Sequence, residues 1–229
     1  MPIVKHAVIA AAGLGSRLGH GKPKCLEKFD NVTIIEHLLS LLADVPDVRV
    51  VVGFMEAEVI QEVARLRPDA IIVRNSSFRT TTTLHSYTIG SKGIHGDCLF
   101  MDADLLIVPE TFHAFISGCQ PSVARLALTK AKTNDAVFVD LEGNKVVGFR
   151  RDDPTEWEWS NVSWLPVSIF NDIGNTAVYE HLINFLPISS AVLDSWEIDT
   201  LDDFDRANKM RHLFMLGKRN KEGFRRASD

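Results

Sequence analysis

Residues 10–24 read Ala-Ala-Ala-Gly-Leu-Gly-Ser-Arg-Leu-Gly-His-Gly-Lys-Pro-Lys, and they continue an apolar run that begins at Ala7. Glycine and alanine leave room for backbone N–H groups to come close to the oxygens of an anion. Arg17 and Lys24 add cationic donors that complement the charge of a phosphate. The stretch therefore predicts a phosphate-binding loop directly after the first strand.

Two other glycine-rich loops do not fit this stretch. A Walker A loop that ended at Gly21-Lys22 would place Pro23 where a serine or threonine must stand. A dinucleotide-binding fingerprint that began at Gly13 would meet Leu18 at its third glycine. The sequence therefore disfavours both a P-loop nucleotide hydrolase and a dehydrogenase.

The elements around the loop predict the fold class. β-Branched runs alternate with helical patterns through residues 1–120, and strands are expected at 5–11, 49–53, 70–74 and 97–101. Helices are expected at 33–43, 56–65 and 84–91, and the first of them has Thr33 and Glu36 at capping-box spacing. Such alternation predicts a Rossmann-like α/β domain in which a mixed, mainly parallel sheet is flanked by helices on both faces.

Residues 121–216 have a different pattern of predicted secondary structure. Strands are expected at 123–129, 136–141 and 145–150 without helices between them, and Glu142-Gly143-Asn144 favours a hairpin turn. Helices are expected near 169–185 and 201–216, and the basic residues of 217–229 predict a solvated tail. We therefore expect one domain over 1–229, with antiparallel strands in its second half.

The composition argues against several classes of protein. The chain has 229 residues, of which 45% are hydrophobic, so it can bury a core and is not expected to be disordered. Its net charge of −5 argues against a nucleic-acid partner. The three cysteines form no CxxC pair, and no apolar run reaches the roughly 18 residues that span a bilayer. We expect a cytoplasmic protein that has no membrane partner.

Three motifs together carry a resemblance to a known family. The pattern A-A-G-x-G-S-R-x(5)-P-K runs from Ala11 to Lys24, Phe-Met-Asp-Ala-Asp occupies 100–104, and Glu-Ile-Asp-Thr occupies 197–200. In this order and spacing they resemble nucleotidyltransferases of the nucleotide-diphospho-sugar transferase fold. The chain length and the stretch 75–86 are similar to those of the short phosphocholine-type cytidylyltransferases. The resemblance makes 1–120 a nucleotide-binding half and 121–216 an acceptor-binding half, followed by the basic tail.

The resemblance implies that an acceptor phosphate attacks the α-phosphorus of a nucleoside triphosphate and that pyrophosphate leaves. A phosphate monoester is mostly dianionic at neutral pH, so this reaction needs charge neutralisation rather than a general base. The resemblance makes Lys24 and Arg17 catalytic, and it makes Asp104 and Asp199 ligands of Mg²⁺, the expected cofactor. Asp102 is expected to bind nucleotide, and a role as a third metal ligand stays open.

The nucleotide is expected at the carboxyl ends of the strands. Its base is expected to meet the backbone near 11–13 and the hydroxyl groups of 79–86, which can donate to or accept from cytosine. Helix capping by the same threonines is the alternative interpretation. The predicted nucleotide-binding residues are Ala11, Ala12, Gly13, Gly15, Ser16, Arg17, Lys24, Thr82, Thr83, Ser86 and Asp102.

Candidates for acceptor binding lie in the second half of the chain. Lys130 and Lys132 follow an expected strand and are candidates for the acceptor phosphate. Trp159 and Trp164 are candidates for the rest of the acceptor, because aromatic faces bind ammonium groups. The phosphocholine enzymes carry a tryptophan where this chain has Ala136, which argues against phosphocholine. Phosphoethanolamine, an aminoalkylphosphonate, a phospho-amino acid, glycerol phosphate and a sugar phosphate stay open.

The resemblance thus predicts Mg²⁺-dependent transfer of a cytidylyl group from CTP to a small phosphorylated or phosphonate acceptor. A sugar-1-phosphate nucleotidyltransferase that uses UTP, GTP or dTTP is one alternative. A non-catalytic nucleotide-binding protein of the same fold is the other, and the complete set of Arg17, Lys24, Asp104 and Asp199 argues against it. The oligomeric state stays open, a homodimer included.

Overall fold

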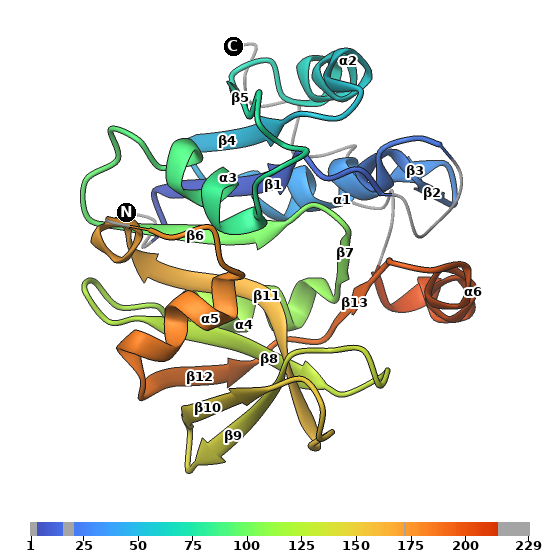
Figure 1. Cartoon of the computed structure of the whole chain (residues 1–229). Coiled ribbons are helices and arrows are strands. Elements are labelled where there is room, and N and C mark those ends of the chain that lie inside the picture. The colour runs from blue at the N-terminus through green and yellow to red at the C-terminus, as the bar shows by residue number, and fades with distance from the viewer. Residues whose placement is uncertain (1–3, 16–20, 172, 215–229) are drawn as a thin grey trace.

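A nine-stranded sheet runs through the centre of the protein in the computed structural model, which describes residues 4–15, 21–171 and 173–214 (Figure 1). The strand order is β5-β4-β1-β6-β11-β8-β12-β10-β9. The strands share one direction except β10 and β11, which are antiparallel to their neighbours. The expected mixed, mainly parallel sheet is confirmed.

The first half of the chain alternates strands with helices, as its sequence predicts. Its strands in the large sheet are β1 (His6–Ala11), β4 (Asp47–Val52), β5 (Ile71–Arg74) and β6 (Asp97–Asp102). Its helices are α1 (Ile34–Leu41), α2 (Glu56–Leu66), α3 (Thr83–Gly90) and α4 (Pro109–Ser117), of which the last was not expected. A 3-10 turn (Lys24–Leu26) and the short pair β2 (Lys28–Phe29) and β3 (Val32–Thr33) follow β1.

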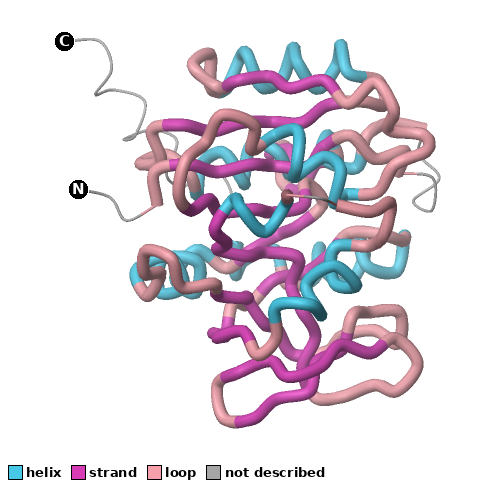
Figure 2. The backbone as a smooth tube through the Cα atoms, turned by 60° about the vertical axis from the view of Figure 1, so that its left-hand side comes forward, coloured by secondary structure: helices cyan, strands magenta, loops and turns pink. Residues whose placement is uncertain are grey.

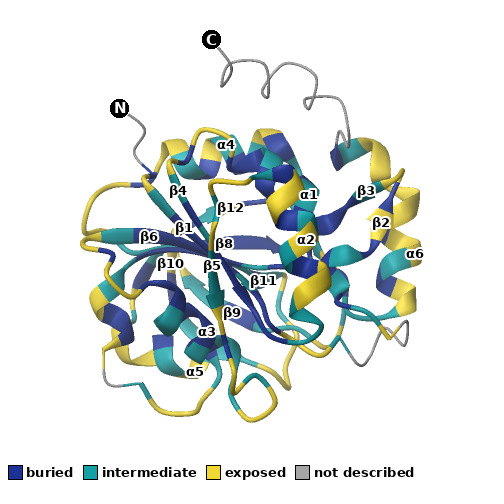
Figure 3. Ribbon diagram, turned by 90° about the horizontal axis from the view of Figure 1, so that it is seen from above, coloured by how far each residue is buried: buried dark blue, intermediate teal, exposed yellow. Residues whose placement is uncertain are grey.

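Helices cover both faces of the sheet, because successive side chains of each strand point to opposite faces. Ile9 and Leu99 join a buried apolar cluster with α1, α2 and α4, whereas Val8 and Phe100 join another with α3 and α5 (Val178–Leu182). Figure 3 shows α1, α2 and α4 on one side of the strands and α3 and α5 on the other. The expected arrangement of helices is confirmed.

The second half of the chain is rich in strands, and its part of the sheet closes on itself. Its strands are β8 (Arg125–Lys130), β9 (Phe138–Glu142), β10 (Lys145–Arg150), β11 (Trp157–Pro166), β12 (Ile188–Val192) and β13 (Ser195–Glu197). The last of these pairs with β7 (Leu105–Ile107) of the first half in a separate two-stranded sheet. Besides pairing with β6 and β8, β11 pairs with β9 at Glu158. Figure 2 shows this strand-rich part below the parallel strands.

The helices expected near 169–185 are confirmed only in part. The structure divides this region into a 3-10 turn at Val167–Phe170, the short α5 and a second 3-10 turn at Ile183–Phe185. Gly174 and Asn175 lie between the first turn and α5, and both residue types disfavour a helix interior. The other expected helix is shorter than predicted: α6 spans Leu201–Lys209 and is followed by a 3-10 turn at Arg211–Phe214.

β11 is the longest strand and joins the two halves, yet the sequence does not predict it. Most of its residues are buried from Trp159 to Leu165, so it lacks the alternation that marks a strand with one solvated face. Its register is also irregular between Trp159 and Ser163, and Asn161 there has a left-handed φ of 56°. Long-range pairing, rather than a local pattern, determines this strand.

None of the helices in the described ranges has both the length and the apolar character that crossing a bilayer requires. The predicted basic tail 217–229 lies outside the described residues.

Candidate active site

Three carboxylates gather where β6 ends. The chain leaves β6 at Asp102 and turns into β7, and β13 lies antiparallel to β7 with Glu197 opposite Leu105. The Ile198 N–H donates to the Asp104 carbonyl oxygen over 2.8 Å, which fixes the two segments side by side. As a result, carboxylate oxygens of Asp104, Glu197 and Asp199 lie within 4.8 Å of one another. We call these three residues the acidic cluster.

Lys24 faces the acidic cluster from the opposite side of the site. It begins the 3-10 turn after Pro23, and its Nζ lies 3.0 Å from Asp104 Oδ2 and also donates to the Asp199 carboxylate. Burial disfavours the charged amine, but the carboxylates of Asp104 and Asp199 outweigh that effect and raise the pKa of Lys24. Lys24 is therefore a protonated cation at the centre of the site.

The acidic cluster fits a divalent cation. Asp104 Oδ1 is buried and has no hydrogen-bond partner among the described residues, which leaves one ligand atom unused. Although Glu197 is exposed toward the second cavity, partial desolvation and then the neighbouring carboxylates of Asp104 and Asp102 raise its pKa well above the usual range, a repulsion that a bound cation relieves. Mg²⁺ binds hard carboxylate oxygens together with the phosphates of a substrate. Asp104, Glu197 and Asp199 are the residues that would hold it.

The residues around the acidic cluster orient its members. Asn161 Nδ2 donates to Glu197 Oε2 over 3.1 Å from the irregular part of β11. Thr200 is the N-cap of α6, and its hydroxyl accepts from the Asp203 N–H over 3.2 Å while the Asp203 carboxylate accepts from the Thr200 N–H. Thr200 thus caps the helix, and Asp199 before it turns toward Lys24 instead.

Asp102 lies beside the acidic cluster and has a different environment. The Tyr87 hydroxyl donates to Asp102 Oδ1 over 2.6 Å from α3. Burial and then the nearby Asp104 raise the pKa of Asp102 to about 7. Asp102 lines two adjoining cavities, so it stands where their contents would meet.

The first cavity has a volume of about 490 Å³ and lies along the glycine-rich loop. Gly15 has a φ of +60°, and a Cβ there would come within 3.1 Å of Lys24 Cγ, so both the backbone and the space require glycine. Ser16 and Arg17 lie outside the described residues. The other predicted nucleotide-binding residues all line this cavity: Ala11, Ala12, Gly13, Gly15, Lys24, Thr82, Thr83, Ser86 and Asp102.

The threonines before α3 do not act as caps. Thr82 occupies the N-cap position, but its hydroxyl donates to the Thr176 carbonyl oxygen over 2.6 Å and accepts no bond from a helix N–H. At the same end of the cavity the buried Asn75 donates to the hydroxyl groups of Thr81 and Ser86, both over 3.2 Å. The hydroxyl groups here thus belong to a polar network at the cavity wall.

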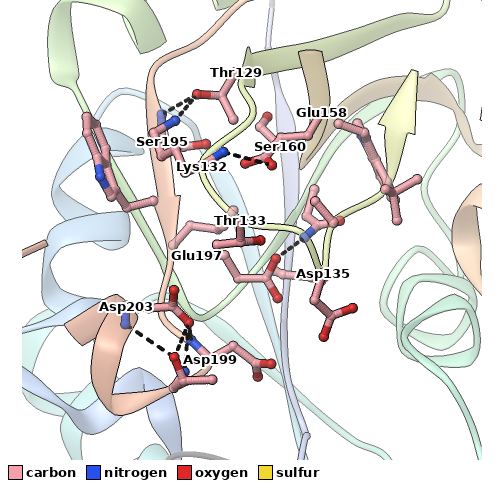
Figure 4. Close-up of a pocket in the computed structure, with 18 of the residues that line it drawn as sticks. Thr129, Lys132, Thr133, Asp135, Glu158, Ser160, Ser195, Glu197, Asp199 and Asp203 are labelled. Carbon is pink, nitrogen blue, oxygen red and sulfur yellow. Dashed lines mark hydrogen bonds between the residues drawn. The ribbon is translucent and has the colours of Figure 1, made fainter. Parts of the chain in front are cut away.

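The second cavity has a volume of about 1040 Å³ and lies between the strand-rich half, α5 and α6 (Figure 4). It shares Thr82, Thr83 and Asp102 with the first cavity. Figure 4 shows Glu197 and Asp199 on its lower part and Glu158 and Lys132 at its upper end. The acidic cluster therefore connects the two cavities: Asp104 lines the first, and Glu197 and Asp199 line the second.

Two of the four predicted acceptor-binding residues line the second cavity. Trp159 does so from β11, and Lys132 does so with its Nζ 4.6 Å from the centre of the Trp196 ring. Lys130 does not line it, since its amine contacts Glu156 and the Trp157 ring. Trp164 is buried and donates from Nε1 to the Gln120 carbonyl oxygen over 2.9 Å, away from the cavity.

Sequence reasoning missed Glu197, Asn161 and Glu158. Glu197 belongs to the recognised Glu-Ile-Asp-Thr motif, and its spacing of two from Asp199 was a usable signal, because alternate residues of an extended chain share a face. Glu158 stands beside Trp159 in the second cavity, but it lies on the unpredicted β11. No local pattern indicates Asn161, whose role depends on that strand's irregularity.

Comparison with known proteins gives a consistent result. A profile of the MobA-like NTP transferase domain matches residues 7–179. The bifunctional protein GlmU of Synechococcus sp. (strain CC9605) is 25% identical over 214 residues, which are 90% of this chain and 46% of that protein. The chain spans at most about half the length of the curated relatives that it matches.

Two solved structures share the fold over almost the whole chain. The inositol-1-phosphate CTP transferase from T. maritima superposes with a TM-score of 0.79 at 16% identity, over 94% of this chain and 98% of that one. The CTP:phosphocholine cytidylyltransferase LicC from Streptococcus pneumoniae superposes with a TM-score of 0.75 at 17% identity, over 90% of this chain and 98% of that one. At these identities the likeness shows a common fold.

Proposed function

Because the chain belongs to the MobA-like NTP transferase family, we propose that this nucleotidyltransferase joins CTP to a small phosphorylated or phosphonate acceptor. An acceptor oxygen bonds to the α-phosphorus, and the bond from that phosphorus to the bridging oxygen of the leaving pyrophosphate breaks. One observation carries the proposal: two cavities share Thr82, Thr83 and Asp102 and meet at Lys24 and the acidic cluster. Such an arrangement can hold two anionic substrates end to end.

The proposed roles follow from position and charge. The backbone of 11–15 and the ammonium of Lys24 bind the phosphates in the first cavity, and Arg17 of the same loop is proposed to assist. When bound by Asp104, Glu197 and Asp199, Mg²⁺ supplies positive charge against the reacting phosphates. Residues 1–120 thus bind the nucleotide, and 121–216 bind the acceptor and complete the acidic cluster.

Two observations support CTP over other nucleotides. Both of the superposed structures described above are named as CTP-dependent enzymes. The wall of the first cavity also offers hydroxyl groups at Thr82, Thr83 and Ser86, which match a base that has both donors and acceptors. A cytoplasmic setting agrees with three buried cysteines, all of them thiols.

The charge at the upper end of the second cavity supports an acceptor with a cationic head group. Glu158 Oε2 accepts one long hydrogen bond of 3.4 Å from the Lys132 N–H, and the charges of Lys132 and Arg206 act on the carboxylate without a direct ion-pair contact among the described residues. The Lys132 amine donates instead to Thr129 and to the Lys130 carbonyl oxygen. The Glu158 carboxylate and the Trp159 indole both line this cavity, and each kind of group attracts an ammonium group. Phosphoethanolamine and an aminoalkylphosphonate have the required charges at both ends.

The experiment that tests this proposal measures pyrophosphate release with Mg²⁺ for five nucleotides against a panel of acceptors. CTP, UTP, GTP, ATP and dTTP are each combined with phosphocholine, phosphoethanolamine, 2-aminoethylphosphonate, glycerol 3-phosphate, phospho-amino acids and sugar 1-phosphates. We expect turnover with CTP and an amine-bearing acceptor. Turnover only with another nucleotide and a sugar 1-phosphate would overturn the cytidylyl assignment, and nucleotide binding without turnover on any acceptor would overturn catalysis.

A further inference from the structure

Asn75 is a buried amide whose orientation is fixed by its neighbours. It follows β5, its own N–H donates to the Val52 carbonyl oxygen over 2.8 Å, and only 2% of its surface is exposed. Its Oδ1 accepts from the Ser77 N–H over 3.0 Å. A backbone N–H can only donate, so the oxygen of the amide must face Ser77 and the NH₂ group must face the other way.

The NH₂ group of Asn75 therefore donates to the hydroxyl groups of Thr81 and Ser86. Thr81 passes its own hydrogen to the Ser77 carbonyl oxygen over 3.0 Å, so its hydroxyl is fully used inside the network. Ser86 is different, because its O–H has no acceptor among the described residues although only 3% of the residue is exposed. Ser86 lines the first cavity, where a bound ligand could supply that acceptor.

Building on the proposed function, we infer that Asn75 sets Ser86 as a hydrogen-bond donor to N3 of cytosine and thereby selects CTP over UTP. Asn75 is a positioning residue in this scheme, since it acts through Ser86. A buried O–H that meets an acceptor is satisfied, whereas one that meets another donor loses its only bond. Cytosine has a lone pair at N3, and uracil has an N–H group there. The hydrogen bond from Asn75 also polarises the serine hydroxyl and strengthens its donation.

The test reverses the polarity of the network with one isosteric substitution. Asn75→Asp keeps the acceptor for the Ser77 N–H but replaces the NH₂ group by a second acceptor, toward which the Ser86 O–H turns. Ser86 then presents a lone pair to the base, which suits the N3–H of uracil. We expect the ratio of kcat/KM for CTP to that for UTP to fall at least roughly tenfold. An equal loss with both nucleotides would reduce Asn75 to a structural role.

A second variant keeps the inference testable if Asn75→Asp does not fold. Ser86→Ala removes only the hydroxyl, and we expect it to lower the CTP to UTP ratio by roughly tenfold through a loss confined to CTP. The 3-deaza analogue of CTP, which lacks the N3 lone pair, is the matched probe. The wild-type protein should lose about as much with this analogue as Ser86→Ala loses with CTP, and Ser86→Ala should lose nothing further with it. Independent, additive losses would overturn the contact.

The outcomes separate this inference from the function on which it rests. If the wild-type protein uses CTP but the two variants keep its CTP to UTP ratio, the inference fails and cytidylyl transfer stands. If the wild-type protein prefers another nucleotide at the outset, the proposed function fails first. Thermal melting of each variant shows whether the fold is retained.

Discussion

The two cavities of this protein are built in opposite ways. The first is lined by four short segments within residues 10–15, 23–25, 75–86 and 102–104, and most of these lining residues are small. The second takes its lining from segments scattered over residues 82–210, and most of its polar groups are charged side chains. The comparison teaches that short local segments can build most of one cavity, whereas the other depends on side chains that tertiary packing brings together.

The largest expected effect tests whether the loop supplies the catalytic cation. Lys24→Ala should lower kcat on the order of 10³-fold, because it removes a partly buried cation from the point where the cavities meet. Lys22→Ala is the matched control, since the Lys22 amine is 42% exposed and pairs with Glu27 over 3.0 Å. Steady-state pyrophosphate release measures both variants. A larger loss of kcat for Lys22→Ala than for Lys24→Ala would mean that Lys22, and not Lys24, is the catalytic lysine.

The second-largest expected effect tests whether both halves of the chain contribute ligands to one metal site. Asp104→Asn and Glu197→Gln should each lower turnover on the order of 10²-fold and raise the Mg²⁺ concentration needed for half-maximal rate, and chelation should abolish turnover. Asp205→Asn is the control, because Asp205 is exposed on α6 and lines neither cavity. An unchanged Mg²⁺ requirement in either cluster variant would remove that residue from the site.

The free energy of unfolding is expected to depend on pH through a buried histidine in the first half. His37 is buried on α1 with its Nε2 2.9 Å from the Ile107 carbonyl oxygen, and burial lowers the pKa of His37 to about 4. The unfolded chain binds this proton near pH 6.5, so the folded state loses stability as the pH falls from about 6.5 to about 4.

Over that window the His37 contribution should reach about 3 kcal/mol of unfolding free energy. Urea unfolding at several pH values measures it, with His37→Gln as the comparison. The variant should show a flatter pH dependence than the wild type. Parallel pH profiles for the two proteins would mean that His37 contributes nothing.

The smallest effect concerns acceptor selection in the second half. Glu158→Gln should raise KM for an amine-bearing acceptor roughly tenfold and leave KM for CTP unchanged, because the carboxylate lies at the far end of the second cavity. Glu156→Gln is the matched control, since Glu156 pairs with Lys130 at the surface and lines neither cavity. Equal changes in both KM values would argue against an ammonium contact at Glu158.

The difference between the cavities also explains which parts of the fold and the site could be predicted from the sequence. The glycine-rich loop acts through short, fixed spacings, so residues 11–15 and Lys24 were predicted together and line one cavity. The alternation of strands and helices in the first half is equally local, and β1, β4, β5 and β6 appear within a few residues of their expected bounds. Asp104 and Asp199 were predicted through motifs, and the structure brings them together.

The second half could not be predicted to the same extent, because its geometry depends on distant pairing. β11 is buried among β6, β8 and β9, so no alternating pattern marks it. Trp159 and Trp164 have the same residue type and lie on the same strand, but their odd spacing of five residues puts them on opposite faces, in different apolar clusters. Only one of them lines the cavity, and the sequence alone offered no reason to choose between them.

The wall that the two cavities share has a consequence for inhibitors. Thr82, Thr83 and Asp102 border both cavities, so under the proposed function the joined product would extend across both of them. A stable mimic of that product would bind as two tethered fragments, and tethering raises the effective concentration of the second fragment once the first has bound. Contacts in both cavities would contribute to the affinity of such a compound. Contacts in one cavity would be enough to make it selective. Under the proposed function, side chains from scattered segments would contact the acceptor end of the compound. Chemical variation at that end would therefore distinguish this enzyme from others of its fold.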